Sequence, residues 1–73
     1  MSKLDQIRSV VAQTFGVPLA SVTEASSSDT IEAWDSMHHL HLIIALEAEL
    51  GVSIEPDEAV ELTSVKKILE AVR

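Results

Sequence analysis

The sequence predicts an all-α fold: a small four-helix bundle with a long loop between the first two helices and a short third helix. Apolar residues recur at helical spacing in three separate stretches, and Gly16 and Gly51 follow the first two stretches where helices end. The chain has 73 residues, of which 47% are apolar, so we expect a single domain, residues 1–73, with one core. This length excludes a catalytic cleft between two domains, and the lack of cysteine in the sequence excludes disulfides and thiolate metal sites.

The first helix is predicted over residues 3–15. Ser2 can cap its start, and Gly16, followed by Pro18, marks its end. Residues 16–34 show neither a helical nor a strand period and form a long loop. We expect apolar side chains of this loop to hold it to the core, namely Val17, Leu19, Val22, Ile31 and Trp34.

The second helix is predicted to begin at Asp35 or Ser36 and to end at Leu50. Its apolar residues form two arcs, which together are wider than the apolar stripe of an ordinary surface helix. The inner arc consists of Leu42, Ile43, Leu46 and Leu50 with His39 in its middle, and the outer arc consists of Met37, Leu40, Ile44 and Ala48 with Glu47 between the arcs. Either the helix is central and covered on both sides, or the outer arc is exposed and binds partners. The acidic residues nearby favour an exposed docking arc.

The third helix is predicted over residues 56–61, because Pro56 suits a first helical position and Asp57 and Glu58 suit a first turn. Glu61 would extend the acidic surface of this helix. We expect Thr63 to cap the last helix, whose apolar stripe is formed by Val65, Ile68, Leu69 and Val72.

The charge is concentrated in the middle of the chain. Ten of the twelve acidic residues lie between residues 24 and 61, where there is no lysine or arginine, so this stretch carries −10 and the flanks together carry +3. Such a field repels nucleic acid and favours partners with basic surfaces, although solubility alone accounts for many acidic surfaces. No apolar run is long enough to span a membrane and no signal peptide is apparent, so we expect a monomeric cytoplasmic protein without a membrane partner.

The segment Asp35-Ser36-Met37 joins the long loop to the second helix. Asp35 or Ser36 can cap the first turn, and most such pairs do no more. A capping box would place Glu or Gln three residues after the cap, but His38 and His39 stand there. A serine at a helix N-terminus also suits a phosphate ester, because free N–H groups and the helix dipole stabilise the negative charge.

Over nearly its whole length the chain resembles the acyl carrier proteins, in particular specialised stand-alone carriers. The resemblance rests on Asp35-Ser36-Met37, on the run from Leu40 to Gly51, and on residues 56–59 and 62–65. It implies that Ser36, with Asp35 beside it, carries a covalent 4′-phosphopantetheine arm whose thiol holds acyl groups as thioesters. It also implies a carrier rather than an enzyme, with a phosphopantetheinyl transferase and acyl-loading and acyl-processing enzymes as partners. These enzymes would bring basic surfaces to the docking residues Met37, Leu40, Ile44, Glu47, Ala48, Asp57 and Glu58.

Several functions stay open at this stage. Trp34, Met37 and the three histidines of the second helix favour a dedicated pathway over the usual fatty-acid carrier, and fatty-acid, polyketide or related cargo all fit. An aminoacyl or D-alanyl carrier for nonribosomal peptide or envelope modification is the close alternative. A helical interaction module without any modification is the remote one.

The histidines suggest three further hypotheses. His38 and His41 could share a zinc ion, but the sequence places no third ligand, so we expect no metal site. Catalysis by Ser36 with a neighbouring histidine lacks an oxyanion-hole loop. His39 is expected near the third helix with one nitrogen bonded to backbone or water, either filling a gap or guarding the entrance to the bundle against long apolar cargo.

Overall fold

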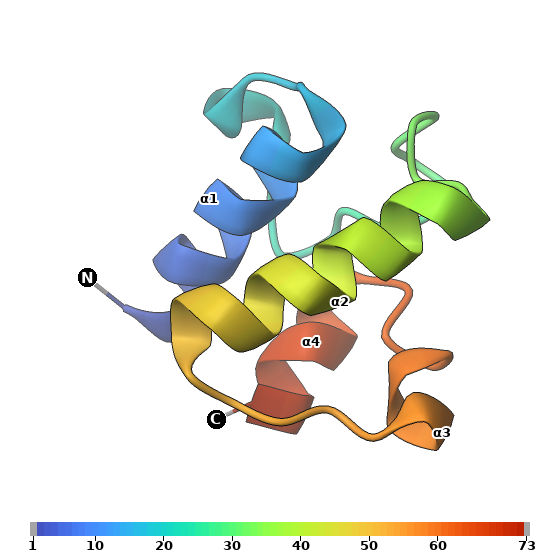
Figure 1. Cartoon of the computed structure of the whole chain (residues 1–73). Helices are drawn as coiled ribbons and strands as arrows, with labels where there is room; N and C mark the ends of the chain where they lie inside the picture. The colour runs from blue at the N-terminus through green and yellow to red at the C-terminus, as the bar shows by residue number, and fades with distance from the viewer. Residues whose placement is uncertain (1, 73) are drawn as a thin grey trace.

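The computed structural model describes residues 2–72, and within them four α-helices surround one apolar core (Figure 1). The helices are α1 (Lys3–Phe15), α2 (Ser36–Leu50), α3 (Pro56–Ala59) and α4 (Val65–Val72), with a short 3-10 helix, η1 (Leu19–Ser21), in the long loop. Helix α1 packs against both α2 and α4. The predicted all-α bundle with a long first loop and a short third helix is confirmed.

Local capping fixes the ends of the two long helices. The hydroxyl of Ser2 accepts a hydrogen bond from the Asp5 N–H at 3.1 Å, which starts α1 at the predicted residue. Gly16 and Gly51 end α1 and α2 in the left-handed conformation, at φ 67° and 65°. Residues with a Cβ rarely adopt this conformation, so a glycine is favoured at both positions.

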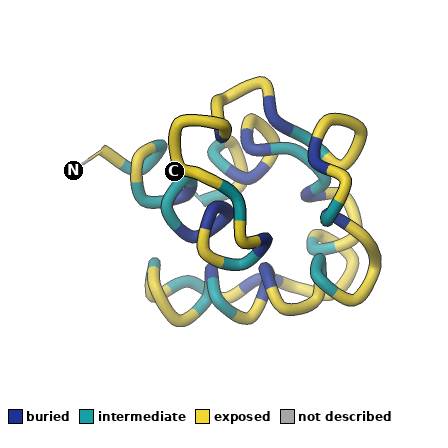
Figure 2. The backbone as a smooth tube through the Cα atoms, turned by 90° about the horizontal axis from the view of Figure 1, so that it is seen from above, coloured by how far each residue is buried: buried dark blue, intermediate teal, exposed yellow. Residues whose placement is uncertain are grey.

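The core draws its side chains from all the long helices and from the loop. Figure 2 shows buried and exposed stretches alternating along the backbone, as amphipathic helices require. Three of the loop residues expected to reach the core, Val22, Ile31 and Trp34, are buried, and Val17 is half-buried. The expectation for Leu19 was wrong, because its side chain lies at the start of η1 and is 50% exposed.

Hydrogen bonds hold the long loop in place. The Arg8 guanidinium on α1 donates to the carbonyl of Val22 at 2.6 Å and to that of Leu19 at 3.1 Å. Further along, the Ser28 N–H donates to the Thr63 carbonyl and the Val65 N–H donates to the Ser26 carbonyl, both at 2.9 Å. The second half of the loop is therefore fixed beside the start of α4.

Two predicted boundaries were wrong. Helix α3 ends at Ala59 instead of residue 61, because the Glu61 N–H turns back to the Glu58 carbonyl and closes the segment as a tight turn. Helix α4 is capped by Ser64 instead of Thr63, since the Ser64 hydroxyl accepts the Lys67 N–H at 3.1 Å.

Candidate functional site

The head of α2 carries the Asp-Ser-Met segment. Asp35 is the N-cap: its carboxylate accepts the N–H of His38 at 2.9 Å and also lies 2.9 Å from Nδ1 of the same ring. An ionised carboxylate can only accept, so Nδ1 is the donor in the second bond. The backbone N–H of His38, followed by its ring, holds the pKa of Asp35 below the usual value of 3.8.

Ser36 is the first residue of α2 and lies at the surface. Because Asp35 does the capping, the Ser36 hydroxyl is not needed for that purpose, and within residues 2–72 its side chain makes no hydrogen bond. It stands at the positive end of the α2 dipole, where a negatively charged ester is stabilised. The serine therefore combines an accessible hydroxyl with an environment that favours a phosphate group.

A cleft of about 440 Å³ opens beside Ser36. Trp34, just before α2, and His39, on α2, line one side of it, and Val60 lines it from the turn after α3. Ser28 and Thr63 complete the lining; they belong to the two segments that are joined by the hydrogen bond from the Ser28 N–H to the Thr63 carbonyl. The walls thus offer apolar surface as well as two hydroxyl groups. A flexible group attached at Ser36 has a place to lie against the protein.

His39 connects the cleft to the short helix. Its Nδ1 is 3.0 Å from Nε1 of Trp34, and its Nε2 is 2.7 Å from the carbonyl oxygen of Ala59 on α3. The ring is half-buried and stacks near the indole, with the ring centroids 6.3 Å apart. The expected placement of His39 near the third helix, bonded to backbone, is confirmed.

The outer arc of α2 is exposed. Met37, Leu40 and Ile44 are 68%, 59% and 57% exposed, and Ala48 is exposed as well, whereas most of the inner arc is buried. The outer arc is therefore not covered by the rest of the described chain, whereas the inner arc packs into the core. The sequence reasoning missed Val60, which is 70% exposed and lines the cleft. An apolar residue just before the end of the predicted third helix, with no place in any stripe, was the available signal.

The acidic residues near this arc have different surroundings. Asp57, Glu58 and Glu61 are exposed on α3 and the turn that follows it. Glu47 is half-buried, and its Oε2 accepts the N–H of Ile54 at 3.0 Å. Glu47 therefore ties the segment after α2 back to the helix, in addition to any role toward a partner.

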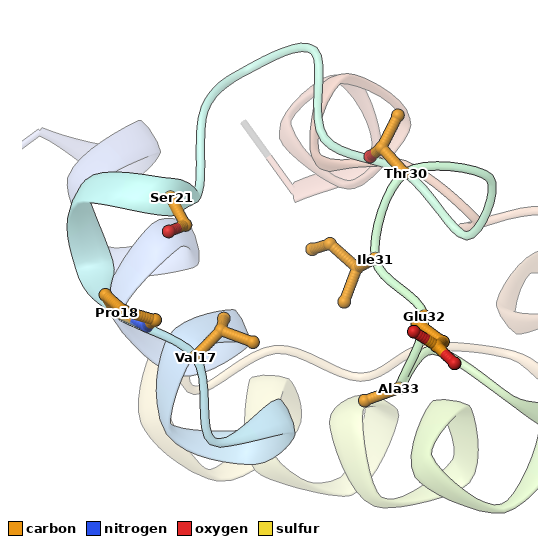
Figure 3. A pocket seen from close by; sticks show the side chains of 7 residues that line it. All are labelled: Val17, Pro18, Ser21, Thr30, Ile31, Glu32 and Ala33. Atoms are coloured by element: carbon orange, nitrogen blue, oxygen red, sulfur yellow. The ribbon is translucent and has the colours of Figure 1, made fainter.

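The other features considered lie apart from this cleft or are incomplete. A second hollow, between residues 17–21 and 30–33 of the long loop, has Ile31 pointing into it but includes neither Asp35 nor Ser36 (Figure 3). Within residues 2–72 no group of three histidine or acidic side chains is placed to hold a metal ion, although the rings of His38 and His41 lie 6.2 Å apart. In the same part of the chain, every helix is too short or too polar to cross a membrane.

Comparison with known proteins gives matches that cover most of the chain. Residues 5–72 match the family described as "Phosphopantetheine attachment site". An acyl carrier protein of Thermosynechococcus vestitus is 38% identical over 68 residues, which are 92% of this chain and 83% of that protein. Both matches span the head of α2 and the cleft beside it.

Proposed function

The chain belongs to the acyl carrier protein family, and from this premise we propose that Ser36 is the residue to which its 4′-phosphopantetheine is covalently attached. The observation that carries the proposal is the division of roles at the head of α2. Asp35 supplies the cap, so the exposed hydroxyl of Ser36 remains at the helix terminus for a phosphodiester.

The residues around Ser36 suit this group. The start of α2 stabilises the phosphate charge, and the cleft lined by Trp34, Val60 and Thr63 has room for the arm against apolar surface and hydroxyl groups. When bound, the group supplies a thiol that carries acyl groups as thioesters. The chain itself contains no cysteine. We therefore propose a carrier that presents acyl intermediates to other enzymes and does not itself catalyse a reaction.

We propose that the partners dock on the outer arc of α2. Met37, Leu40 and Ile44 form an exposed apolar strip that starts beside Ser36, with Ala48 at its far end. Asp57 and Glu58 on α3 add negative charge close to Val60. A transferase and acyl-handling enzymes with basic surfaces match this combination, because an apolar contact gives affinity and opposite charges speed association. Fatty-acid, polyketide and related pathways all use carriers of this kind.

The test is attachment of the arm in vitro. Incubation with coenzyme A and a phosphopantetheinyl transferase should raise the intact mass by one arm in the wild type and leave it unchanged in Ser36→Ala. The matched control is Ser28→Ala, since Ser28 lines the same cleft but lies outside the helix terminus. Loading of Ser36→Ala, or no loading of the wild type, would contradict the assignment.

A further inference from the structure

Helix α3 is attached to α2 through His39. The four residues of α3 contribute no buried side chain, so apolar packing alone holds this helix weakly. His39 lies one turn beyond Ser36 on α2 and reaches across to the carbonyl of Ala59, the last residue of α3, which also accepts the Leu62 N–H at 3.2 Å. This bond closes the space between the two helices next to the attachment site.

The partners of His39 determine where its proton lies. An indole nitrogen can only donate, so Nδ1 of His39 accepts from Trp34 and the N–H must be at Nε2, from which it is donated to Ala59. Trp34 is only 5% exposed. If the ring swung away, the indole N–H would lose its partner in a largely apolar setting. The three groups therefore hold one another in place.

The apolar core begins directly behind this ring. Leu42, Ile43 and Leu46 follow His39 on the same side of α2 and are all buried, yet none of them lines the cleft. Trp34, which is itself a core residue, lines the cleft together with His39. A chain that extended from Ser36 toward the core would therefore meet the hydrogen-bonded ring first.

We infer that Trp34, His39 and the Ala59 carbonyl form a latch that keeps the cargo of this carrier in the surface cleft and outside the core. The inference rests on the proposed attachment at Ser36 and names the cargo class that fits: short or polar acyl groups. A long apolar chain would either stay in contact with water or break the hydrogen bonds of the latch, and both are unfavourable. A short or polar group can stay in the cleft and requires neither.

The experiment compares thermal stability across acyl chain lengths. The full chain is loaded from acetyl-, butanoyl-, hexanoyl- and octanoyl-coenzyme A, and intact mass confirms the loading before the melting temperature is measured. The wild type should melt at the same temperature with every chain. His39→Leu should gain a few degrees with each additional pair of methylenes, because burial of apolar surface in the core stabilises the folded state.

Two further variants separate the latch from a general effect of substitution. His41→Leu makes the same change on an exposed part of α2 and should show no dependence on chain length. His39→Gln keeps an N–H donor near the position of Nε2 and should behave as the wild type. If His39→Leu fails to fold, a melting temperature that rises with chain length in the wild type overturns the latch by itself.

The outcomes distinguish the latch from the carrier assignment. A melting temperature that rises with chain length in the wild type as steeply as in His39→Leu would overturn the latch but leave the attachment intact. No length dependence in either protein would also overturn it, because His39 would then not be the barrier. Failure of Ser36 to accept any arm would overturn the attachment and the latch together.

Discussion

The two apolar faces of α2 have the same kind of side chains and opposite surroundings. Leu42 and Leu46 on the inner face have no exposed surface, whereas Leu40 and Ile44 on the outer face keep 59% and 57% of theirs. A helical period identifies both faces equally well. Which of them is covered depends on where α1 and the loop lie, and the loop is placed by contacts distant in sequence. The difference teaches that burial of the inner face alone is enough to hold α2 in the fold, so the outer face is uncovered and free for the proposed docking.

The largest expected effect is on the inner face. Leu46→Ala removes a fully buried side chain and should lower the free energy of unfolding by about 2–5 kcal/mol. Leu40→Ala, the same change on the outer face, should stay within about 0.5 kcal/mol. Urea denaturation monitored by circular dichroism measures both values. Equal losses in the two variants would mean that the faces are not distinct in solution.

Glu47 lies on the boundary between the faces and should give an intermediate result. Glu47→Ala removes the acceptor of the Ile54 N–H and should cost about 1 kcal/mol of unfolding free energy. Glu47→Gln retains an acceptor oxygen and should lose less. If the alanine variant were as stable as the wild type, the contact with Ile54 would contribute nothing and Glu47 would belong to the outer face.

A smaller effect is expected from charge beside the outer face. Glu58→Lys should slow arm transfer by a phosphopantetheinyl transferase several-fold at low salt, and the difference should shrink in high salt because ions screen the attraction. The control Glu24→Lys changes the net charge equally in the long loop. Stopped-flow or initial-rate measurements over a salt series provide the comparison. A salt-independent loss would point to a damaged contact instead of steering.

The smallest effect is expected from Asp35, the N-cap of α2, which lies between the long loop and the helix. The pKa of Asp35 is lowered in the folded state, so its ionised form stabilises the fold at pH values above the unfolded value of 3.8. This contribution is lost as the pH falls through the lower folded-state pKa. Melting temperatures of wild type and Asp35→Asn should therefore differ by a constant amount near neutral pH and converge in acid, since asparagine also caps helices but does not titrate there. A constant difference down to pH 2 would contradict the role of the carboxylate.

The parts of this structure that sequence predicts are those with local causes. Ser2, Asp35 and the two terminal glycines act within a few residues, so the bounds of α1 and α2 could be read from the chain. The cap of α4 could not be read in this way, because it depends on a pairing between residues 26–28 and residues 63–65 that is distant in sequence. In this pairing the Thr63 carbonyl accepts the Ser28 N–H, and α4 starts after Ser64, whose hydroxyl forms the cap.

The candidate site also has parts with local causes and parts that depend on contacts distant in sequence. Ser36 and Asp35 were proposed as site residues from one short segment, and the inward position of His39 followed from the helical period. Its partner, the Ala59 carbonyl, lies 20 residues away on the backbone and leaves no trace in the side-chain pattern. Val60 and the cleft it lines arise from the turn that ends α3 early, which depends on the hydrogen bonds of residues 58–62.

The central claim is that the inner face of α2 maintains the fold while the outer face serves partners, and the neighbouring isoleucines test it most directly. Ile43 is 7% exposed and Ile44 is 57% exposed. For Ile43→Ala and Ile44→Ala, we would measure the free energy of unfolding and the kcat/KM of arm transfer per folded molecule. Ile43→Ala should lose stability and keep its loading rate, whereas Ile44→Ala should keep stability and lose at least about fivefold in loading. Unchanged loading of Ile44→Ala, or the same loss in both variants, would contradict the claim.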